Sequence, residues 1–208
     1  MPWSKEQMAQ EVIQLIPANS SLNLGIGLPT MIAELIPVHM HLMIHSENGV
    51  LGVEGRPGPD SISSTLINAG KETIAIKKGA SFFDSALSFG MIRGGHIDYC
   101  VLGGMEVDVT GSLANWMIPG KKITGMGGAM DLVNGAKNII IMMTHFNKRG
   151  DSKIVKSCQL PLTGKNVVDT IVTDYGIFKP HKNRFKIIKL AVGSSLESLK
   201  IDKQLLEN

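Results

Sequence analysis

Short apolar segments, each followed by a glycine turn and then by residues at helical spacing, recur along the chain and constrain its fold more than any other feature. Residues 21–24 form such a segment, Gly25-Ile26-Gly27 makes a tight turn, and Pro29 stands where the first turn of a helix tolerates proline. The apolar runs 99–102 and 138–143 repeat the pattern. Because parallel strands are buried on both faces and need crossovers, the sequence predicts an α/β fold with a mainly parallel sheet flanked by helices.

Local signals predict the other elements. Ser4 and Gln7 make a capping box, and apolar residues follow at helical spacing until Pro17, which predicts an amphipathic helix. Residues 40–45 predict a strand that ends in the turn Ser46-Glu47-Asn48-Gly49. We also expect a helix over 29–36, an exposed loop over 52–60 and a strand over 73–76. A further helix should be capped by Ser81 and Asp84 and end after Arg93 at a left-handed Gly94. Near the end of the chain we expect a hairpin of 177–178 with 185–192 and a closing helix over 195–200.

The composition fits one globular unit. Of the 208 residues, 43% are hydrophobic and 19% are charged, which excludes disorder and predicts a single domain over residues 1–208. The net charge of +3 and the low content of Trp and Tyr argue against nucleic-acid binding. Residues 145–208 hold more than half of the basic side chains, which leaves open either contacts with phosphates or a solvated lysine-rich surface.

The cysteine content and the apolar runs indicate a compartment. Cys100 and Cys158 cannot form a disulfide framework, which favours a reducing environment. The first residues lack the basic region and apolar stretch of a signal peptide. The longest strongly apolar run, 139–143, is far shorter than the roughly 20 residues of a membrane helix. We therefore expect a cytoplasmic protein that does not enter a membrane.

The turn at Gly25 and Gly27 partly matches a dinucleotide-binding fingerprint. It lies between a predicted strand and a predicted helix, and Glu47 follows about twenty residues on. Thr30 stands in place of the third glycine, so the match is incomplete. Two other interpretations stay open: the glycines only permit the turn, or the backbone N–H groups of the helix start approach a phosphate or an acyl oxygen.

Other common catalytic motifs are missing from the sequence. No Gly-Lys pair is followed by Ser or Thr, so there is no phosphate-binding Walker loop, and no Gly-x-Ser-x-Gly elbow is present for a serine hydrolase. His39 and His41 would share one face of a strand and begin a metal site, but no acidic or Cys ligand follows at suitable spacing. We expect no metal.

Glu47 is the most informative single residue. It follows a predicted strand of the parallel type, at the edge where open α/β sheets bind their ligands. A carboxylate there either caps neighbouring N–H groups or serves as a nucleophile or base, and the residues alone leave both open. The glycine-rich stretch 125–128 is either a flexible turn or a source of amides for a developing oxyanion.

Six motifs, taken in order, resemble the B-type subunit of the 3-oxoacid (succinyl-CoA:3-ketoacid) CoA-transferases, within the class I CoA-transferases. The resemblance runs from about residue 20 to residue 178. The motifs are Asn23-Leu-Gly-Ile-Gly-Leu-Pro-Thr30, Ser46-Glu-Asn-Gly-Val-Leu-Gly52, Ile92-Arg-Gly-Gly-His-Ile-Asp98, Leu102-Gly-Gly-Met-Glu-Val107, Leu113-Ala-Asn-Trp-Met-Ile-Pro119 and Gly125-Met-Gly-Gly-Ala-Met-Asp-Leu132. The resemblance implies an α/β fold related to that of ribose phosphate isomerases.

The resemblance also implies a site and a reaction. Glu47 would attack an acyl-CoA, such as succinyl-CoA, and carry CoA as a covalent thioester to a 3-oxo acid such as acetoacetate. Gly128 and Ala129 would line the oxyanion hole. The residues implied to bind substrate or CoA are Asn23, Gly25, Gly27, Asn48 and Gly127.

The same resemblance sets the expected partners. CoA would be a substrate and covalent intermediate, with no permanently bound cofactor, and an A-type CoA-transferase subunit would complete the pocket in a heterodimer or heterotetramer. The alternatives are a subunit of an acetate- or butyrate-type CoA-transferase, a non-catalytic relative and a dinucleotide-binding protein. The segment 52–59 differs from the glycine pattern of the family, which leaves the acyl-group preference open.

Overall fold

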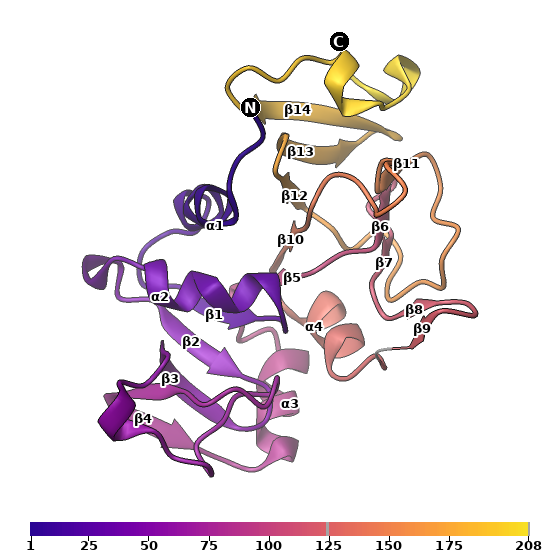
Figure 1. The fold of residues 1–208 in the computed structure, drawn as a ribbon. Helices are drawn as coiled ribbons and strands as arrows, with labels where there is room; N and C mark the ends of the chain where they lie inside the picture. The colour runs from indigo at the N-terminus through magenta and orange to yellow at the C-terminus, as the bar shows by residue number, and fades with distance from the viewer. Residues whose placement is uncertain (124, 208) are drawn as a thin grey trace.

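A nine-stranded sheet forms the centre of the computed structural model, which describes residues 1–123 and 125–207 (Figure 1). Its strands, in the order in which they lie side by side, are β14 (Arg184–Leu190), β13 (Gly176–His181), β12 (Thr170–Thr173), β10 (Asn138–Met142), β5 (Tyr99–Leu102), β1 (Ser21–Leu24), β2 (Met43–Ser46), β3 (Val50–Gly55) and β4 (Ala75–Phe82). The central strands, from β12 to β2, pair in parallel, and the strands at both edges pair antiparallel. The predicted parallel sheet is confirmed for the centre, and hairpins extend it at each edge.

Helices cover both faces of the sheet (Figure 1). On one face lie α1 (Lys5–Gln14) and α2 (Ile32–Leu35), and on the other α3 (Ser85–Arg93) and α4 (Ala129–Gly135). Successive residues of a strand point to opposite faces, so Val101 packs in the cluster under α1 while Cys100 and Leu102 pack in the cluster under α3 and α4. The central strands are therefore buried on both sides, as their apolar sequences require.

Helix α1 begins as its sequence predicts. The Ser4 hydroxyl accepts a hydrogen bond from the Gln7 N–H, and the Gln7 side chain accepts one from the Ser4 N–H. The capping box is confirmed. The apolar face buries Met8, Val12 and Ile13 against the sheet, which fixes the helix across β10 and β12.

Smaller elements gather beside α4 (Figure 1). A three-stranded sheet contains β6 (Glu106–Asp108), β7 (Leu113–Ala114) and β11 (Ile154–Val155), and a short hairpin contains β8 (Met117–Ile118) and β9 (Lys122–Ile123). The 3₁₀ helices are η1 (Leu28–Met31), η2 (Val38–Met40), η3 (Pro59–Ser61), η4 (Glu197–Leu199) and η5 (Lys203–Leu205).

The second strand and the loop after it were predicted with wrong boundaries. Strand β2 starts at Met43, because Met40 belongs to η2 and His41 is left-handed. The loop expected over 52–60 is strand as far as Gly55. Gly52 and Gly55 have positive φ angles, and the register of β3 against β4 shifts next to both. These irregularities bend a strand whose glycines indicated a loop in the sequence.

Five other expectations also need correction. The strand expected over 73–76 is β4, which extends to Phe82 and includes Ser81. The N-cap of α3 is Asp84 alone, whose side chain accepts from the Leu87 N–H. Gly94 has a φ of −77°, and the left-handed residue is Gly95 at +73°. The helix expected over 195–200 is only the 3₁₀ turn η4. The helix expected over 29–36 is divided into the 3₁₀ helix η1 and the short α-helix α2.

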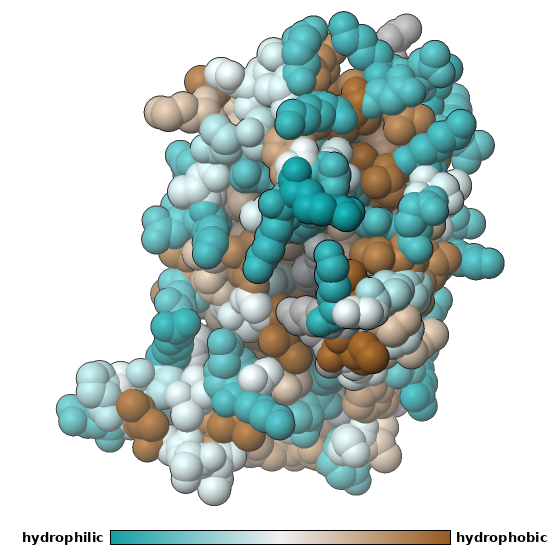
Figure 2. Space-filling view, turned by 45° about the vertical axis from the view of Figure 1, so that its right-hand side comes forward, coloured by the Kyte–Doolittle hydropathy of each residue, from teal (hydrophilic) through white to brown (hydrophobic). Residues whose placement is uncertain are grey.

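The hairpin near the end of the chain is confirmed as β13 and β14. In the described part of the chain, no helix has both the length and the apolar content to cross a membrane. Figure 2 shows a face on which hydrophilic side chains predominate and apolar atoms form small groups between them.

Candidate active site

Glu47 lies in the turn between β2 and β3. The Gly49 N–H donates to the Ser46 carbonyl at 2.9 Å, which closes the turn, and Gly49 has a φ of +111°. A side chain on Gly49 would collide with the Phe83 carbonyl, so this position accepts only glycine. Because β2 is parallel to β1, the turn holds Glu47 at the carboxyl ends of the parallel strands, where such sheets bind ligands.

The carboxylate of Glu47 rests against the backbone of Gly128. The Gly128 N–H donates to Glu47 Oε1 at 3.3 Å. A Cβ atom on Gly128 would lie 2.7 Å from Glu47 Cδ, so any larger residue would displace the carboxylate. Gly127, with a φ of +49°, turns the chain just before this contact. The glycines thus bring an amide to a half-buried carboxylate without adding side-chain volume.

The surroundings of Glu47 disfavour its charge. Burial raises the pKa of Glu47 above its ordinary value of 4.5, the hydrogen bond from Gly128 opposes that rise, and the negative charge of Asp131 adds to it. Burial removes water from the carboxylate oxygens, and the Gly128 N–H replaces part of that hydration. The side chain is a partly desolvated carboxylate, and loss of hydration is one way in which a charged nucleophile becomes more reactive.

A cavity of about 460 Å³ opens in front of the carboxylate. Its walls come from the ends of β1, β2 and β5 and from the segment before α4. Of the residues predicted for the site, those that line it are Asn23, Gly25, Gly27, Glu47, Gly127, Gly128 and Ala129. Four segments from distant parts of the sequence therefore meet around one carboxylate, in a volume that suits a small acyl group and its thioester.

Residues 5–192 match the Coenzyme A transferase family. The chain belongs to this family. The B-type subunit of a probable succinyl-CoA:3-ketoacid coenzyme A transferase of Bacillus subtilis is 51% identical over 199 residues, which are 96% of this chain and 92% of that protein. The beta subunit of an acetate CoA-transferase of Haemophilus influenzae is 47% identical over 197 residues, which are 95% of this chain and 88% of that protein.

A solved structure shares the fold of this CoA transferase. The apoenzyme of an acyl-CoA transferase from Escherichia coli O157:H7 superposes with a TM-score of 0.77 at 17% sequence identity, over 99% of this chain. The chain spans 41% of that longer chain. The likeness confirms the class I CoA-transferase fold that the motifs implied.

Two of the residues predicted for the site make other contacts. Asn48 is exposed and does not line the cavity; its side chain donates to the Ile67 carbonyl at 2.8 Å and holds the neighbouring loop. The Ala129 N–H donates to the Met126 carbonyl at 3.0 Å, so it is engaged in the turn before α4. Of the two residues proposed for an oxyanion hole, Gly128 is the one whose N–H points to Glu47.

The glycines after β1 shape the opposite wall. A Cβ atom on Gly25 would lie 2.8 Å from Leu102 Cδ2, so this glycine lets β1 end close to β5. Gly27 has a φ of +93° and is followed by η1, so no α-helix begins at this turn. The dinucleotide fingerprint needs an α-helix there, and its absence removes the helix N-terminus that would hold a pyrophosphate.

Sequence reasoning missed part of the cavity wall. Residues 102–105 line it from the end of β5, and Asn115 supports them by donating to the Gly103 carbonyl at 3.1 Å. Ala69 lines it too, and its N–H donates to the Ser46 hydroxyl at 3.0 Å. The Gly-Gly pair at 103–104 directly after a predicted parallel strand was a signal that could have located the first of these segments.

A second cleft, which we call the basic cleft, adjoins the first. It shares Gly27, Gly103 and Gly104 with the cavity and has a volume of about 500 Å³. Its charged residues are Lys5, Arg56, Glu72 and Lys153. The half-buried Lys153 donates from Nζ to Thr144 Oγ1 at 2.8 Å. Cations predominate over acids in this cleft, so it suits an anionic group.

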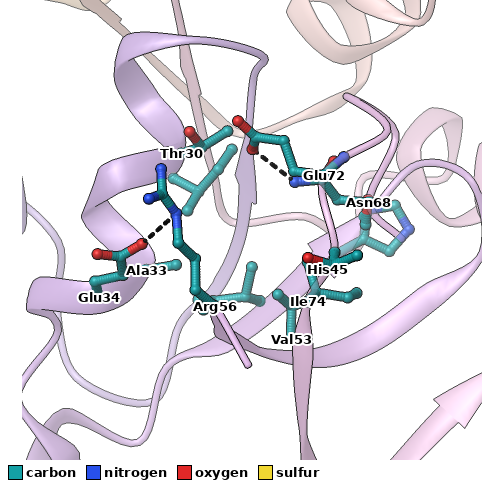
Figure 3. Close-up of a pocket in the computed structure, with 14 residues that line it drawn as sticks. Thr30, Ala33, Glu34, His45, Val53, Arg56, Asn68, Glu72 and Ile74 are labelled. Atoms are coloured by element: carbon teal, nitrogen blue, oxygen red, sulfur yellow. Dashed lines mark hydrogen bonds and ion pairs between the residues drawn. The ribbon is translucent and has the colours of Figure 1, made fainter. Parts of the chain in front are cut away.

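A third hollow, between α2 and strands β2 and β3, is too small for a substrate (Figure 3). Arg56 and Glu34 form an ion pair of 3.0 Å at its rim. Its volume of about 40 Å³ suits water rather than an acyl group.

The two histidines considered as metal ligands do not share a strand face. His39 lies in η2, and His41 is left-handed. Among the described residues, no group of three His, Cys, Asp or Glu side chains is placed to hold a metal ion.

Proposed function

We propose that this chain is the catalytic, B-type subunit of a CoA-transferase that moves CoA from succinyl-CoA, or a similar acyl-CoA, to a 3-oxo acid such as acetoacetate. The observation that carries the proposal is the poorly solvated Glu47 carboxylate, held 3.3 Å from the Gly128 N–H at the wall of a cavity. The name of the Bacillus subtilis relative supports the substrate pair.

In the first step, a carboxylate oxygen of Glu47 attacks the thioester carbonyl carbon of the acyl-CoA. The carbon–sulfur bond breaks, CoA leaves as a thiolate, and an acyl-glutamyl anhydride remains. A carboxylate attacks a thioester slowly in water, so most of the rate must come from holding the two groups together, where effective molarities reach about 10⁵–10⁸ M.

In the second step, the CoA thiolate attacks the glutamyl carbonyl of the anhydride. The carbon–oxygen bond to the acyl group breaks, the first acid leaves as a carboxylate, and Glu47 carries CoA as a thioester. The acceptor carboxylate then attacks this thioester, and the same two steps run in reverse. Atoms and charge balance in each step without any redox group.

The Gly128 N–H suits the oxyanions of these steps. Each attack on the Glu47 carbonyl develops negative charge on an oxygen next to this amide. One preorganised donor of this kind contributes about 3–4 kcal/mol in a site shielded from water. An anhydride hydrolyses readily, so water must be kept out during the reaction.

A second, A-type subunit would supply that cover. The cavity is open to solvent, and Ile26, one of the residues that line it, is exposed. The Bacillus subtilis relative is named for its B-type position in such an enzyme, which fits a heterodimer or heterotetramer in which the other subunit closes the pocket.

The basic cleft is the proposed place for the phosphates of CoA. A CoA molecule whose sulfur lies beside Glu47 must carry its phosphates out of the cavity, and the cleft adjoins the cavity at Gly27, Gly103 and Gly104. Its excess of cations over acids favours the phosphate charges. CoA is a substrate in this scheme, and the scheme requires no permanently bound cofactor.

A second candidate function is that of a subunit in an acetate CoA-transferase. The Haemophilus influenzae relative carries that name at an identity only slightly below that of the Bacillus subtilis relative. Both functions use the same glutamyl thioester. Assays of the complex with the A-type subunit, using acetoacetate against acetate as acceptors and succinyl-CoA, acetyl-CoA and butyryl-CoA as donors, distinguish them.

The covalent step is tested by trapping the thioester. The complex is incubated with acyl-CoA alone, digested, and analysed by mass spectrometry for CoA attached to residue 47. We expect the adduct in the wild-type complex and none with Glu47→Gln, because the amide is not a nucleophile. Glu54→Gln, which changes an exposed glutamate on β3, is the control and should form the adduct normally. Full transferase activity in Glu47→Gln would refute the proposal.

A further inference from the structure

We infer that His45 and Ser88 are positioning residues for Glu47: a directional hydrogen-bond chain that runs from Asn23 through both side chains fixes the peptide group of Glu47 for attack. The inference rests on the proposed function, because it assumes that Glu47 is the nucleophile. It concerns residues that do not touch the substrate, and it assigns a purpose to polar side chains in an apolar layer.

The chain is continuous in the structure. Asn23 Nδ2 lies 3.0 Å from His45 Nδ1 and donates to the His45 carbonyl at 3.2 Å. His45 Nε2 lies 3.0 Å from Ser88 Oγ. The Ser88 hydroxyl donates to the Glu47 carbonyl at 2.7 Å. Three side chains from β1, β2 and α3 thus end on the backbone of the nucleophile.

The direction of every hydrogen bond is fixed by the two ends. Carbonyl oxygens only accept hydrogen bonds. Asn23 must therefore donate from its NH₂ group to the His45 carbonyl, and Ser88 must donate its hydroxyl proton to the Glu47 carbonyl. His45 Nδ1 therefore accepts from Asn23, and His45 Nε2–H donates to Ser88. Only the neutral Nε2–H tautomer of His45 satisfies all of these bonds, since a proton on Nδ1 would face the NH₂ group of Asn23.

Burial supports a neutral, oriented ring. Asn23 is 2% exposed, His45 1% and Ser88 0%. Burial lowers the pKa of His45 to about 4, so the ring is neutral near pH 7. Asn23 and His45 are register partners in the parallel pair of β1 and β2, and the ring stacks on Phe83 at 6.0 Å between centroids. The ring therefore has one rotamer and one tautomer.

An apolar residue at position 45 would fill this layer without the free-energy cost of burying polar groups. Most buried positions of the central strands are apolar, as expected of parallel strands covered on both faces. Burying a histidine, an asparagine and a serine is favourable only if each is fully bonded, and here the side-chain bonds lead from one residue to the next and end on Glu47. This points to a positioning role rather than to core packing.

The hydrogen-bond chain acts on the Glu47 carbonyl, whereas Gly49 closes the turn by donating from its N–H to the Ser46 carbonyl. The Phe83 N–H donates to the Gly49 carbonyl at 3.0 Å, which ties the far end of the turn to the start of α3. Ser88 holds the peptide group between these two contacts through the Glu47 carbonyl. Without its hydroxyl, we expect the peptide after Glu47 to reorient and the carboxylate to shift away from the Gly128 N–H. A displacement of about 1 Å at a reacting group costs roughly 10²-fold in rate.

The experiment measures single-turnover formation of the CoA adduct on residue 47 in the complex with the A-type subunit. Ser88→Ala should slow adduct formation by about 10- to 100-fold, with the KM for acyl-CoA changed by no more than about threefold. Ser85→Ala removes an exposed hydroxyl from the same helix and should behave as wild type. Thermal unfolding of both variants checks that they are folded.

Substitutions of His45 test the donor itself and cover the case in which Ser88→Ala does not fold. His45→Leu removes both ring nitrogens and should slow the reaction as Ser88→Ala does. His45→Gln keeps a donor near the position of Nε2 and should restore adduct formation to within about fivefold of wild type. A double variant, Ser88→Ala with His45→Leu, should be no slower than the slower single variant, because both act through one chain.

The outcomes separate the two proposals. If the wild-type complex forms no adduct on residue 47, the proposed function fails and the inference fails with it. If the wild type forms the adduct and Ser88→Ala or His45→Leu forms it equally fast, only the positioning role is overturned. Equal slowing by His45→Gln and His45→Leu would also overturn it, because the donated hydrogen bond would then be irrelevant.

Discussion

At the scale of single residues, Glu47 lies where burial and a nearby acid disfavour its negative charge. Its carboxylate is shielded from water, receives one amide hydrogen bond from Gly128 and lies in the field of Asp131. Such a group lowers the stability of the folded protein and raises the reactivity of the oxygen. Stability is often sacrificed in this way at active sites.

A substitution of Glu47 therefore has an effect on stability that depends on pH. Because folding raises the pKa of Glu47, the folded state binds the proton more tightly than the unfolded state, and ionisation costs stability as pH rises above 4.5. We predict that Glu47→Gln unfolds at a higher temperature than wild type near pH 7. The difference should shrink as pH falls through 4.5 and vanish well below it, where the Glu47 carboxyl is protonated in both the folded and the unfolded state.

The comparison needs a matched glutamate. Glu54 is exposed on β3, so Glu54→Gln should leave the unfolding temperature unchanged at both pH values. Thermal unfolding followed by circular dichroism provides the measurement. An unfolding temperature for Glu47→Gln at or below that of wild type near pH 7 would contradict the prediction.

At the scale of elements, α3 links the turn that carries Glu47 to the rest of the fold. Its N-cap is Asp84, its Ser88 bonds to the backbone of Glu47, and its Ile92 packs in the core beneath the sheet. The helix contains Gly90 at an exposed position, where an added Cβ would meet no atom within 4 Å. The helix therefore carries a glycine that nothing in its packing requires.

Gly90→Ala should stabilise the protein by about 0.5–1 kcal/mol, because alanine has the higher helix propensity and its methyl group meets open space. Urea unfolding measures the change, and transferase activity should stay within about twofold of wild type. Gly49→Ala serves as the contrast: the new methyl group would collide with the Phe83 carbonyl, so that variant should be destabilised. A loss of stability in Gly90→Ala would show that this account of α3 is wrong.

At the scale of the whole molecule, the cavity and the basic cleft form one surface. They meet at Gly27, Gly103 and Gly104, at the carboxyl ends of the central strands. The cavity holds the carboxylate, and the cleft holds Lys5, Arg56 and Lys153. The cavity therefore suits the reacting group of a substrate, and the basic cleft suits a negatively charged group elsewhere on the same substrate.

Lys153→Met tests this arrangement. Loss of the half-buried ammonium should raise the KM for acyl-CoA by roughly tenfold, as expected for one lost charge-assisted contact, and leave the KM for the acceptor acid unchanged. Steady-state kinetics of the complex with the A-type subunit measures both. Lys156→Met, which removes an exposed lysine three residues on, is the control. An equal rise in both KM values would contradict a role specific to CoA.

The sequence by itself determined the α/β class, the parallel centre of the sheet, helix α1 with its cap, and the placement of Glu47 at a strand end, because these depend on apolar periodicity and on turn residues next to one another in the chain. Only the tertiary structure decided that Gly128 meets Glu47, that Asn48 turns away, and that β3 continues through its glycines. These outcomes depend on contacts between residues as many as 81 positions apart, and on bulges that a partner strand stabilises. Local patterns carry no information about such contacts, because their free energy arises only once the segments have packed together.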